Sequence, residues 1–285
     1  MLALATIIHI IDIGQGNMVL IQTASGRNFV FDCNITEANK SRVLAYVAKQ
    51  IGAGSALRAF ICSHRDADHM RGVDKLDARF SIHSVWDSGY PGTSTSTPEY
   101  QAYMRLRRRV GAVEKKKLTK QDFGRTRFRY MSAQDSRLPR NANAQGIVIK
   151  VEHRSASGGS TLGSVMLPGD SDAAAWKNGI MLDYSSADLS SSLLMGGHHG
   201  SISFFDDPSD EKHYYTRHIR AIKPDMSLIS VGPNSHGHPD SEALKLYEKY
   251  SAGSNKGKKV YRTDKQGTMK ITLKDAGGWN LKVNQ

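Results

Sequence analysis

Four short motifs in this 285-residue chain concentrate histidine and aspartate. SHRDADH at 63–69 places four such side chains within six positions, and LPGD at 167–170, GGHHGS at 196–201 and GHPD at 237–240 follow at long intervals. Imidazole nitrogens and carboxylate oxygens are the ligands that Zn²⁺, Mn²⁺ and Mg²⁺ take from proteins. The motifs therefore predict a site for two neighbouring divalent cations. Its expected metal ligands are His64, Asp66, Asp68, His69, Asp170 and His238.

The spacing within SHRDADH allows one tight turn to present four ligand-type side chains together. His64 and Asp66 would bind one cation, and Asp68 and His69 would bind the other. The alternative is an acidic helix start with incidental histidines, which is less compatible with the three further motifs.

Asp170 is expected to bridge the two cations. A helix N-cap is the alternative for this residue, but Asp172, directly before an alanine-rich stretch, suits that role better. Three residues are expected to be catalytic. Asp68 would orient the attacking hydroxide, and His198 or His199 would contact a cation or protonate the leaving group, the other histidine being structural.

Each motif follows or ends an apolar run typical of a buried strand. These runs cover 59–63, 164–170, 191–195 and 226–232. Further strands are predicted at 7–12, 18–22, 29–32, 147–153, 259–263 and 268–273, and helices at 37–50, 100–110, 173–180, 241–250 and before Pro224. Ligands at strand ends are held by rigid backbone yet remain open to solvent. We therefore expect the four strand-to-motif joints to face one edge of the fold.

The formal charge is +12, and it is unevenly distributed. Residues 100–140 carry thirteen Lys and Arg against three acids. This segment, within a basic insertion at about 90–140, predicts a nucleic-acid surface, because cations that neutralise phosphates release counterions. A solvated basic face is the alternative. The candidate nucleic-acid-binding residues are Arg105, Arg107, Arg108, Arg109, Lys115, Lys116 and Lys117.

Length and composition predict one α/β domain over 1–285, without a membrane span or a signal peptide. Cys33 and Cys62 lie beside apolar runs and form no paired motif. Buried, reduced thiols in a cytoplasmic protein are the expected state. The stretch 251–259 is expected to be an exposed loop.

Five segments in fixed order carry a resemblance to a known family. They are SHRDADH, the GD at 169–170, HHGS, ISVGPNSHGHPDSEAL and YRTDKQG, with IIHIIDIGQGNMVLI and NANAQGIVIKV in support. The chain resembles the metallo-β-lactamase superfamily, and within it the C-terminal hydrolase (DNase) domain of the DNA-uptake protein ComEC and its free-standing relatives. The likeness covers residues 6–273 and is weakest over 90–140. It implies a four-layer αβ/βα sandwich with the site along one edge.

The chain departs from the family's HxHxDH pattern at Asp66, which replaces the second histidine. The next metal histidine of the superfamily has no counterpart before Asp170, where Asn141 and Asn143 lie instead. Replacing nitrogen ligands with oxygen favours Mn²⁺ or Mg²⁺ over Zn²⁺ at one position. The two expected cofactors are therefore Mn²⁺ or Zn²⁺ ions, with Mg²⁺ as an alternative.

The sequence thus predicts a metal-dependent hydrolase of phosphodiester bonds, favouring a DNA nuclease with a two-metal-activated water. Two alternatives stay open. One is a superfamily hydrolase of a small substrate, either a nucleotide phosphodiester or an ester, lactone or thioester. The other is a nucleic-acid-binding module that keeps the fold without the chemistry. A protein partner encoded elsewhere is compatible with either kind of function.

Overall fold

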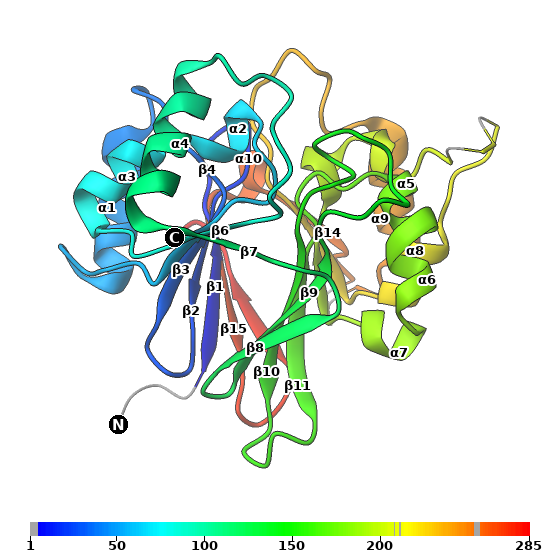
Figure 1. The fold of residues 1–285 in the computed structure, drawn as a ribbon. Helices are drawn as coiled ribbons and strands as arrows, with labels where there is room; N and C mark the ends of the chain where they lie inside the picture. Colours follow the sequence, from blue (N-terminus) through cyan, green and yellow to red (C-terminus); the bar gives the residue numbers. More distant parts are fainter. Residues whose placement is uncertain (1–4, 208, 211, 254–256) are drawn as a thin grey trace.

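Two β-sheets packed face to face form the centre of the molecule, and helices cover both outer faces (Figure 1). The computed structural model describes residues 5–207, 209–210, 212–253 and 257–285. The first sheet runs β16 (Trp279–Lys282), β15 (Met269–Leu273), β1 (Thr6–Ile10), β2 (Val19–Gln22), β3 (Asn28–Phe31), β5 (Ala59–Ile61), β6 (Val85–Asp87) and β7 (Ala112–Glu114). This layered arrangement confirms the expected αβ/βα sandwich.

The second sheet places the strands that precede three of the motifs side by side. Its order is β14 (Val260–Arg262), β13 (Met226–Ile229), β12 (Leu193–Met195), β11 (Thr161–Leu167), β10 (Val148–Arg154), β9 (Thr126–Ser132) and β8 (Thr119–Phe123). β11, β12, β13 and β14 are parallel, as are β3, β5 and β6 in the first sheet. The carboxyl ends of parallel strands share one edge, so the loops after them meet there.

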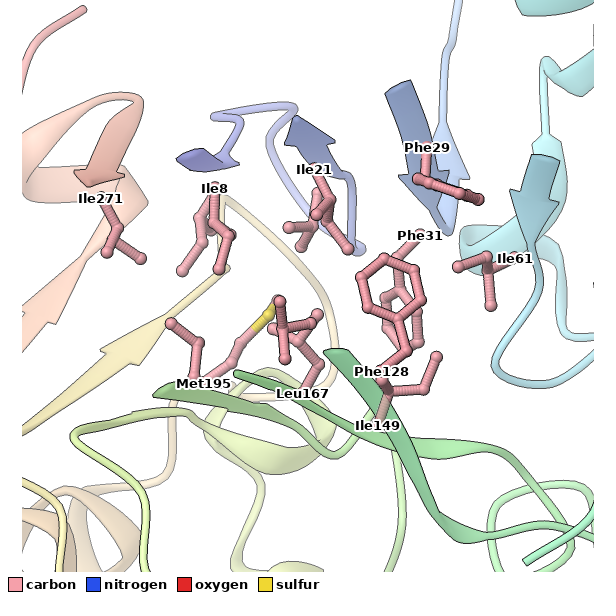
Figure 2. Packing of buried hydrophobic residues seen from close by; sticks show 14 of the residues in the cluster. Ile8, Ile21, Phe29, Phe31, Ile61, Phe128, Ile149, Leu167, Met195 and Ile271 are labelled. Atoms are coloured by element: carbon pink, nitrogen blue, oxygen red, sulfur yellow. The ribbon is translucent and has the colours of Figure 1, made fainter. Parts of the chain in front are cut away.

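The core between the sheets is built from alternate side chains of facing strands (Figure 2). Ile8, Ile21 and Phe31 of the first sheet pack towards Ile149 and Leu167 of the second, and all five are fully buried. Alternation is expected because successive side chains of a strand point to opposite faces. The core therefore holds the two sheets, and the loops at their edge, in one relative position.

Helices bury the opposite face of each sheet. α1 (Lys40–Ile51), α3 (Val73–Phe80) and α4 (Pro98–Val110) pack on the first sheet, and α5 (Ala173–Ala175), α8 (Arg217–Ile222) and α9 (Ser241–Tyr250) on the second. Shorter elements are β4 (Cys33–Asn34), α2 (Ala67–Met70), α6 (Met181–Asp183), α7 (Ser186–Leu189) and α10 (Thr263–Gln266). The helix expected over 173–180 starts as α5 and widens into a π-helical turn at Trp176–Ile180. Asp172 caps it, accepting from the backbone N of Ala175 at 2.8 Å.

The basic segment at 90–140 is built into both layers. α4 packs against α3, β7 extends the first sheet, and β8 and β9 extend the second. β9 was not predicted from the sequence because its arginines alternate with buried residues. Phe128 and Tyr130 face the core, whereas Arg127 and Arg129 lie on the opposite face of the strand. The high charge of this strand thus hides a period-two pattern.

The expectations about membrane spans, cysteines and the loop at 251–259 can be compared with the structure. No helix among the described residues is long and apolar enough to cross a membrane. Cys33 and Cys62 are buried free thiols, as expected. Of the loop expected over 251–259, residues 254–256 lie outside the described part of the chain.

Candidate metal centre

Three of the four motifs meet at one edge of the sandwich. β5 leads into residues 64–69, β11 into Asp170 and β12 into His199. Two groups of ligand-type side chains result, and within each group one ligand atom from every residue lies within 4.8 Å of the others. The first group is His64, His69 and Asp170, and the second is Asp68, His69 and His199.

The carboxylate of Asp170 lies at the centre of this cluster. Its Oδ2 is 3.1 Å from Nε2 of His69, 3.5 Å from Nε2 of His199 and 3.9 Å from Nε2 of His64. Nε2 of His199 is also 3.3 Å from Oδ2 of Asp68. A carboxylate in contact with ligand atoms of both groups is suited to bridge two cations.

Groups behind the cluster orient the histidine rings. Asp32, at the end of β3, accepts from the backbone N and the hydroxyl of Ser63, both at 2.7 Å, and its Oδ2 is 2.8 Å from Nδ1 of His69. The Ser63 hydroxyl is 3.0 Å from Nδ1 of His64, and Nδ1 of His199 donates to the carbonyl oxygen of Ser230 at 3.2 Å. A carboxylate behind a ligating histidine is a recurring feature of metal sites.

The opposite nitrogens of these rings have no hydrogen-bond partner within the described residues. This holds for Nε2 of His64, His69 and His199 and for Oδ1 of Asp170, although all four atoms are buried. Buried polar atoms without partners are costly and need an explanation. Lone pairs that converge in this way fit divalent cations, so the chemistry of the donor set matches the expected cofactor.

Charge in the cluster is balanced by its own imidazoles. Burial opposes the ionisation of Asp170, but the nearby His69, His199 and His198 more than offset it and hold the pKa of this carboxyl well below its ordinary value. Burial likewise disfavours charge on His69, yet Asp170 and Asp32 raise the pKa of its imidazole well above the ordinary value. The carboxylates thus favour positive charge at this position, which a protonated imidazole supplies without metal and a bound cation would supply in its place.

The backbone around the cluster is unusual at two points. His198 and His199 both have left-handed φ angles, 46° and 53°, which non-glycine residues seldom adopt. The conformation is fixed by the backbone N of His198, which donates to the carbonyl oxygen of Gly169 at 3.0 Å. At Gly16, a Cβ would lie 2.7 Å from the carbonyl oxygen of Asp68, so only glycine allows this approach.

A cavity of about 380 Å³ opens onto the cluster. It is lined by Gln15, Asp66, Asp68, Asn143, Asp170, His198, His199, His236 and His238. His198 is partly exposed there; its Nδ1 is 2.8 Å from the hydroxyl of Ser203 and its Nε2 is 3.5 Å from Asp170. A ligand in the cavity would therefore contact the metal cluster and a free imidazole together.

Comparison with known proteins agrees with this geometry. Residues 11–170, more than half of the chain, match the family model of the metallo-beta-lactamase superfamily. The chain belongs to the metallo-beta-lactamase superfamily. This family consists largely of metal-dependent hydrolases, and the His and Asp cluster supplies the metal site that such an enzyme needs.

Solved structures show the same fold at low sequence identity. The metallo-beta-lactamase fold protein YhfI from Bacillus subtilis is 12% identical with a TM-score of 0.52, over 97% of this chain and 100% of that one. Igni18, a metallo hydrolase from Ignicoccus hospitalis, is 9% identical with a TM-score of 0.53, over 97% and 98%. CmlA, a diiron β-hydroxylase from Streptomyces venezuelae, is 13% identical with a TM-score of 0.55, over 94% and 54%. No curated protein matches the sequence significantly.

Two predicted ligands of this superfamily member lie at the cavity wall. Oδ2 of Asp66 is 3.7 Å from Nε2 of His64, and Oδ1 of Asp66 accepts from the backbone N of Thr93 at 3.2 Å. His238 lies outside both ligand groups, with its ring 5.3 Å from that of His198. His199, expected either to contact a cation or to protonate the leaving group, contributes a ligand-type atom to the second group.

Sequence reasoning missed one residue of the site and gave a second no role. Asp32 has no motif around it, and its only signal is a single acid directly after the apolar FVF of β3. Asn143 lies on the cavity wall, in the region where the superfamily's additional metal histidine has no counterpart. The role of Asp32 depends on contacts between the ends of the neighbouring strands β3 and β5, which no local motif shows.

The predicted nucleic-acid residues divide into two sets. Arg107 pairs with Asp87 and Glu114. Arg109 and Lys117 also pair with acids, and Lys115 lies over the ring of Trp86 with its Nζ 3.5 Å from the ring centroid. Arg105, Arg108 and Lys116 are exposed and form no ion pair among the described residues. The second set thus has no acid partner among the described residues, although Arg109 of the first set is also exposed, at 59% of its side chain.

Proposed function

We propose that this protein hydrolyses phosphodiester bonds in DNA at a two-metal site. The observation that carries the proposal is a pair of ligand groups that share His69, contact Asp170 and open onto one cavity. His64 with Asp66 would hold one cation, Asp68 with His199 the other, and Asp170 would lie between them. When bound, such cations lower the pKa of water and offset charge on a phosphodiester.

The residues of the chain prepare the site for this reaction. Asp32, Ser63 and the carbonyl of Ser230 keep the ligand nitrogens aimed inward. His198, on the cavity wall with its Nδ1 held by Ser203, is placed to give a proton to the departing oxygen. Oxygen ligands at Asp66 and Asp170 favour Mn²⁺ at the first position.

DNA is the preferred substrate because of charge and sequence. A net charge of +12 attracts polyanions, and Arg105, Arg108 and Lys116 are exposed for backbone contacts. The resemblance of the motifs to the hydrolase domain of ComEC supports the same substrate class. Charge reversal at these three positions should weaken DNA binding and flatten its salt dependence.

A second candidate is hydrolysis of a small substrate. Two observations favour it: the cavity holds about 380 Å³, and Arg107, Arg109 and Lys117 are engaged in ion pairs with acids of the chain. A nucleotide phosphodiester would need no extended basic track. Steep loss of activity with added salt separates DNA from this alternative.

The test is cleavage of labelled single- and double-stranded DNA, and of a small chromogenic phosphodiester, by metal-stripped protein after Mn²⁺, Mg²⁺ or Zn²⁺ is restored. Asp68→Ala should abolish turnover, as should His199→Ala. The matched controls are Asp210→Ala and His213→Ala, because these residues form an exposed pair on the surface. Both controls should retain full activity.

Each outcome assigns a different function. Cutting of DNA that disappears in the two site variants supports the nuclease. Metal uptake with turnover of the small ester alone moves the assignment to the second candidate. Protein that takes up no metal and cuts nothing, yet binds DNA, is a binding module, and the proposal is then wrong.

A further inference from the structure

A second, smaller cavity lies at the opposite end of the second sheet from the metal cluster. The metal cluster lies at the start of β10, where the backbone N of Ile147 donates to the carbonyl oxygen of Ser63, and at the end of β11, shortly before Asp170. The cavity is instead lined by Arg154 at the end of β10 and Thr161 at the start of β11, and it measures about 260 Å³. It is therefore separate from the proposed catalytic site.

The floor of this cavity consists of buried charged and hydroxyl side chains. Lys150 and Ser164 are 3% exposed and Glu152 is 1% exposed. Outward-facing positions near the other end of this sheet pack apolar side chains against helices. A polar, water-accessible floor in place of such packing is unusual, because buried charges are seldom kept without a partner or a ligand.

Three cations surround the single carboxylate of Glu152. Lys150 Nζ lies 3.3 Å from its Oε1 and Arg129 Nη1 3.7 Å, while Arg154 Nη1 lies 3.5 Å from its Oε2. Arg129 also donates to Asp188 at 2.8 Å. Three cations thus face two carboxylates, so the cluster keeps one positive charge and suits an anionic ligand.

Two buried atoms in the cluster still lack hydrogen-bond partners in the described part of the chain. One is an acceptor, Oε2 of Glu152, and the other is a donor, Nε of Arg154. Hydroxyls of Thr161, Ser164 and two further serines, Ser190 and Ser192, line the walls. A ligand that fits must accept several hydrogen bonds and donate at least one.

We propose that this cavity binds a phosphate group, as the free ion or as the phosphate end of a small molecule. Hydrogen phosphate offers oxygens to Lys150, Arg154 and the wall hydroxyls, and its P–OH donates to Oε2 of Glu152. Sulfate has a similar shape and charge but no proton at neutral pH, so it leaves Oε2 of Glu152 without a hydrogen-bond donor and facing an anion. A site built to receive a hydrogen bond rejects an analogue that lacks the donor.

The experiment is isothermal titration calorimetry of metal-stripped protein with sodium phosphate and with sodium sulfate, at pH 7 and matched ionic strength. Phosphate should bind at least tenfold more tightly than sulfate. Arg154→Gln should weaken phosphate binding about tenfold, whereas Arg42→Gln, on α1 over the first sheet, where this arginine pairs with Asp12, should leave it unchanged. Glu152→Gln should bring phosphate and sulfate close to equal affinity, because an amide donates to either ion.

Circular dichroism verifies that each variant is folded, and Arg154→Gln, at the cavity mouth, keeps the test valid if Glu152→Gln does not fold. The proposal is overturned if the wild-type protein does not bind millimolar phosphate, or if sulfate binds equally well. It is also overturned if His199→Ala, in the metal cluster, abolishes phosphate binding while Arg154→Gln does not. A glucose phosphate or a nucleoside monophosphate in place of phosphate distinguishes the small-molecule source from the free ion. The proposal does not depend on the assigned hydrolase activity.

Discussion

Asp32 determines how the ligand histidines are presented. It binds the backbone and hydroxyl of Ser63 and the Nδ1 of His69, so one buried carboxylate orients the start and end of the SHRDADH turn. Fixing the Nδ1 side of the ring leaves Nε2 as the metal-facing atom. The orientation of the candidate ligand His69 therefore depends on Asp32.

Asp32→Asn should weaken Mn²⁺ or Zn²⁺ affinity by roughly 10–100-fold, because the amide has nearly the same shape but cannot hold His69 by a charged contact. A competition titration against a chromogenic chelator measures this change. Asp210→Asn, at an exposed surface pair, is the control and should bind metal normally. Unaltered affinity in Asp32→Asn would show that the ring needs no such support.

At the scale of elements, Asp87 joins the loop that carries the candidate metal ligands to a helix. This acid at the end of β6 accepts from Arg65 of the SHRDADH turn at 2.9 Å and from Arg107 of α4 at 2.8 Å. Tyr103 of α4 donates to it as well. Asp87 and Arg65 are almost completely buried, at 1% and 6% exposure, so α4 is part of the frame of the site.

Asp87→Ala should lower the free energy of unfolding by about 3–5 kcal/mol, because it leaves Arg65 buried without its partner. Asp122→Ala removes an ion pair to Arg127 whose acid is 52% exposed, and should cost at most about 1 kcal/mol. Urea denaturation of both variants makes the comparison. Equal losses would contradict the view that burial determines the strength of this contact.

For the whole molecule, stability should depend on pH through a buried histidine in the core. His218 lies among four aromatic residues, with its ring 4.4 Å from Phe204 and stacked 5.4 Å from Tyr215. Burial lowers the pKa of His218 from 6.5 to about 3. Between these pH values the unfolded chain holds a proton that the folded protein does not. The free energy of unfolding is therefore unaffected by His218 above pH 6.5, and it decreases as the pH falls towards 3.

Between pH 7.5 and pH 5, the free energy of unfolding of His218→Phe should fall by about 2 kcal/mol less than that of the wild-type protein. Urea unfolding of the wild-type protein and the variant at both pH values gives the difference. His9, whose pKa is lowered to about 4 mainly by burial, should keep its own pH dependence in the variant and provides the internal reference. If His218→Phe had the same pH dependence of stability as the wild-type protein, His218 would not be the group responsible.

Much of this protein was predictable from local pattern. Apolar runs before SHRDADH, LPGD and HHGS predicted β5, β11 and β12, and ligand chemistry predicted a cluster at their ends. Strand periodicity and residue type are properties of adjacent residues, so they can be seen without a structure. The layered fold followed from motif order and from the resemblance to the superfamily.

Other features were decided only by tertiary structure. The structure brings Asp32 to the back of the site and shows that His199, and not His198, belongs to a ligand group. It also places His238 at the cavity wall and pairs Arg107 with Asp87. The spacing of a motif shows which side chains can bind metal or phosphate. Tertiary folding determines which of them meet, because each contact joins residues far apart in the chain. Asp32 and His69 meet between neighbouring strands of one sheet, whereas His69 and Asp170 meet across the two layers.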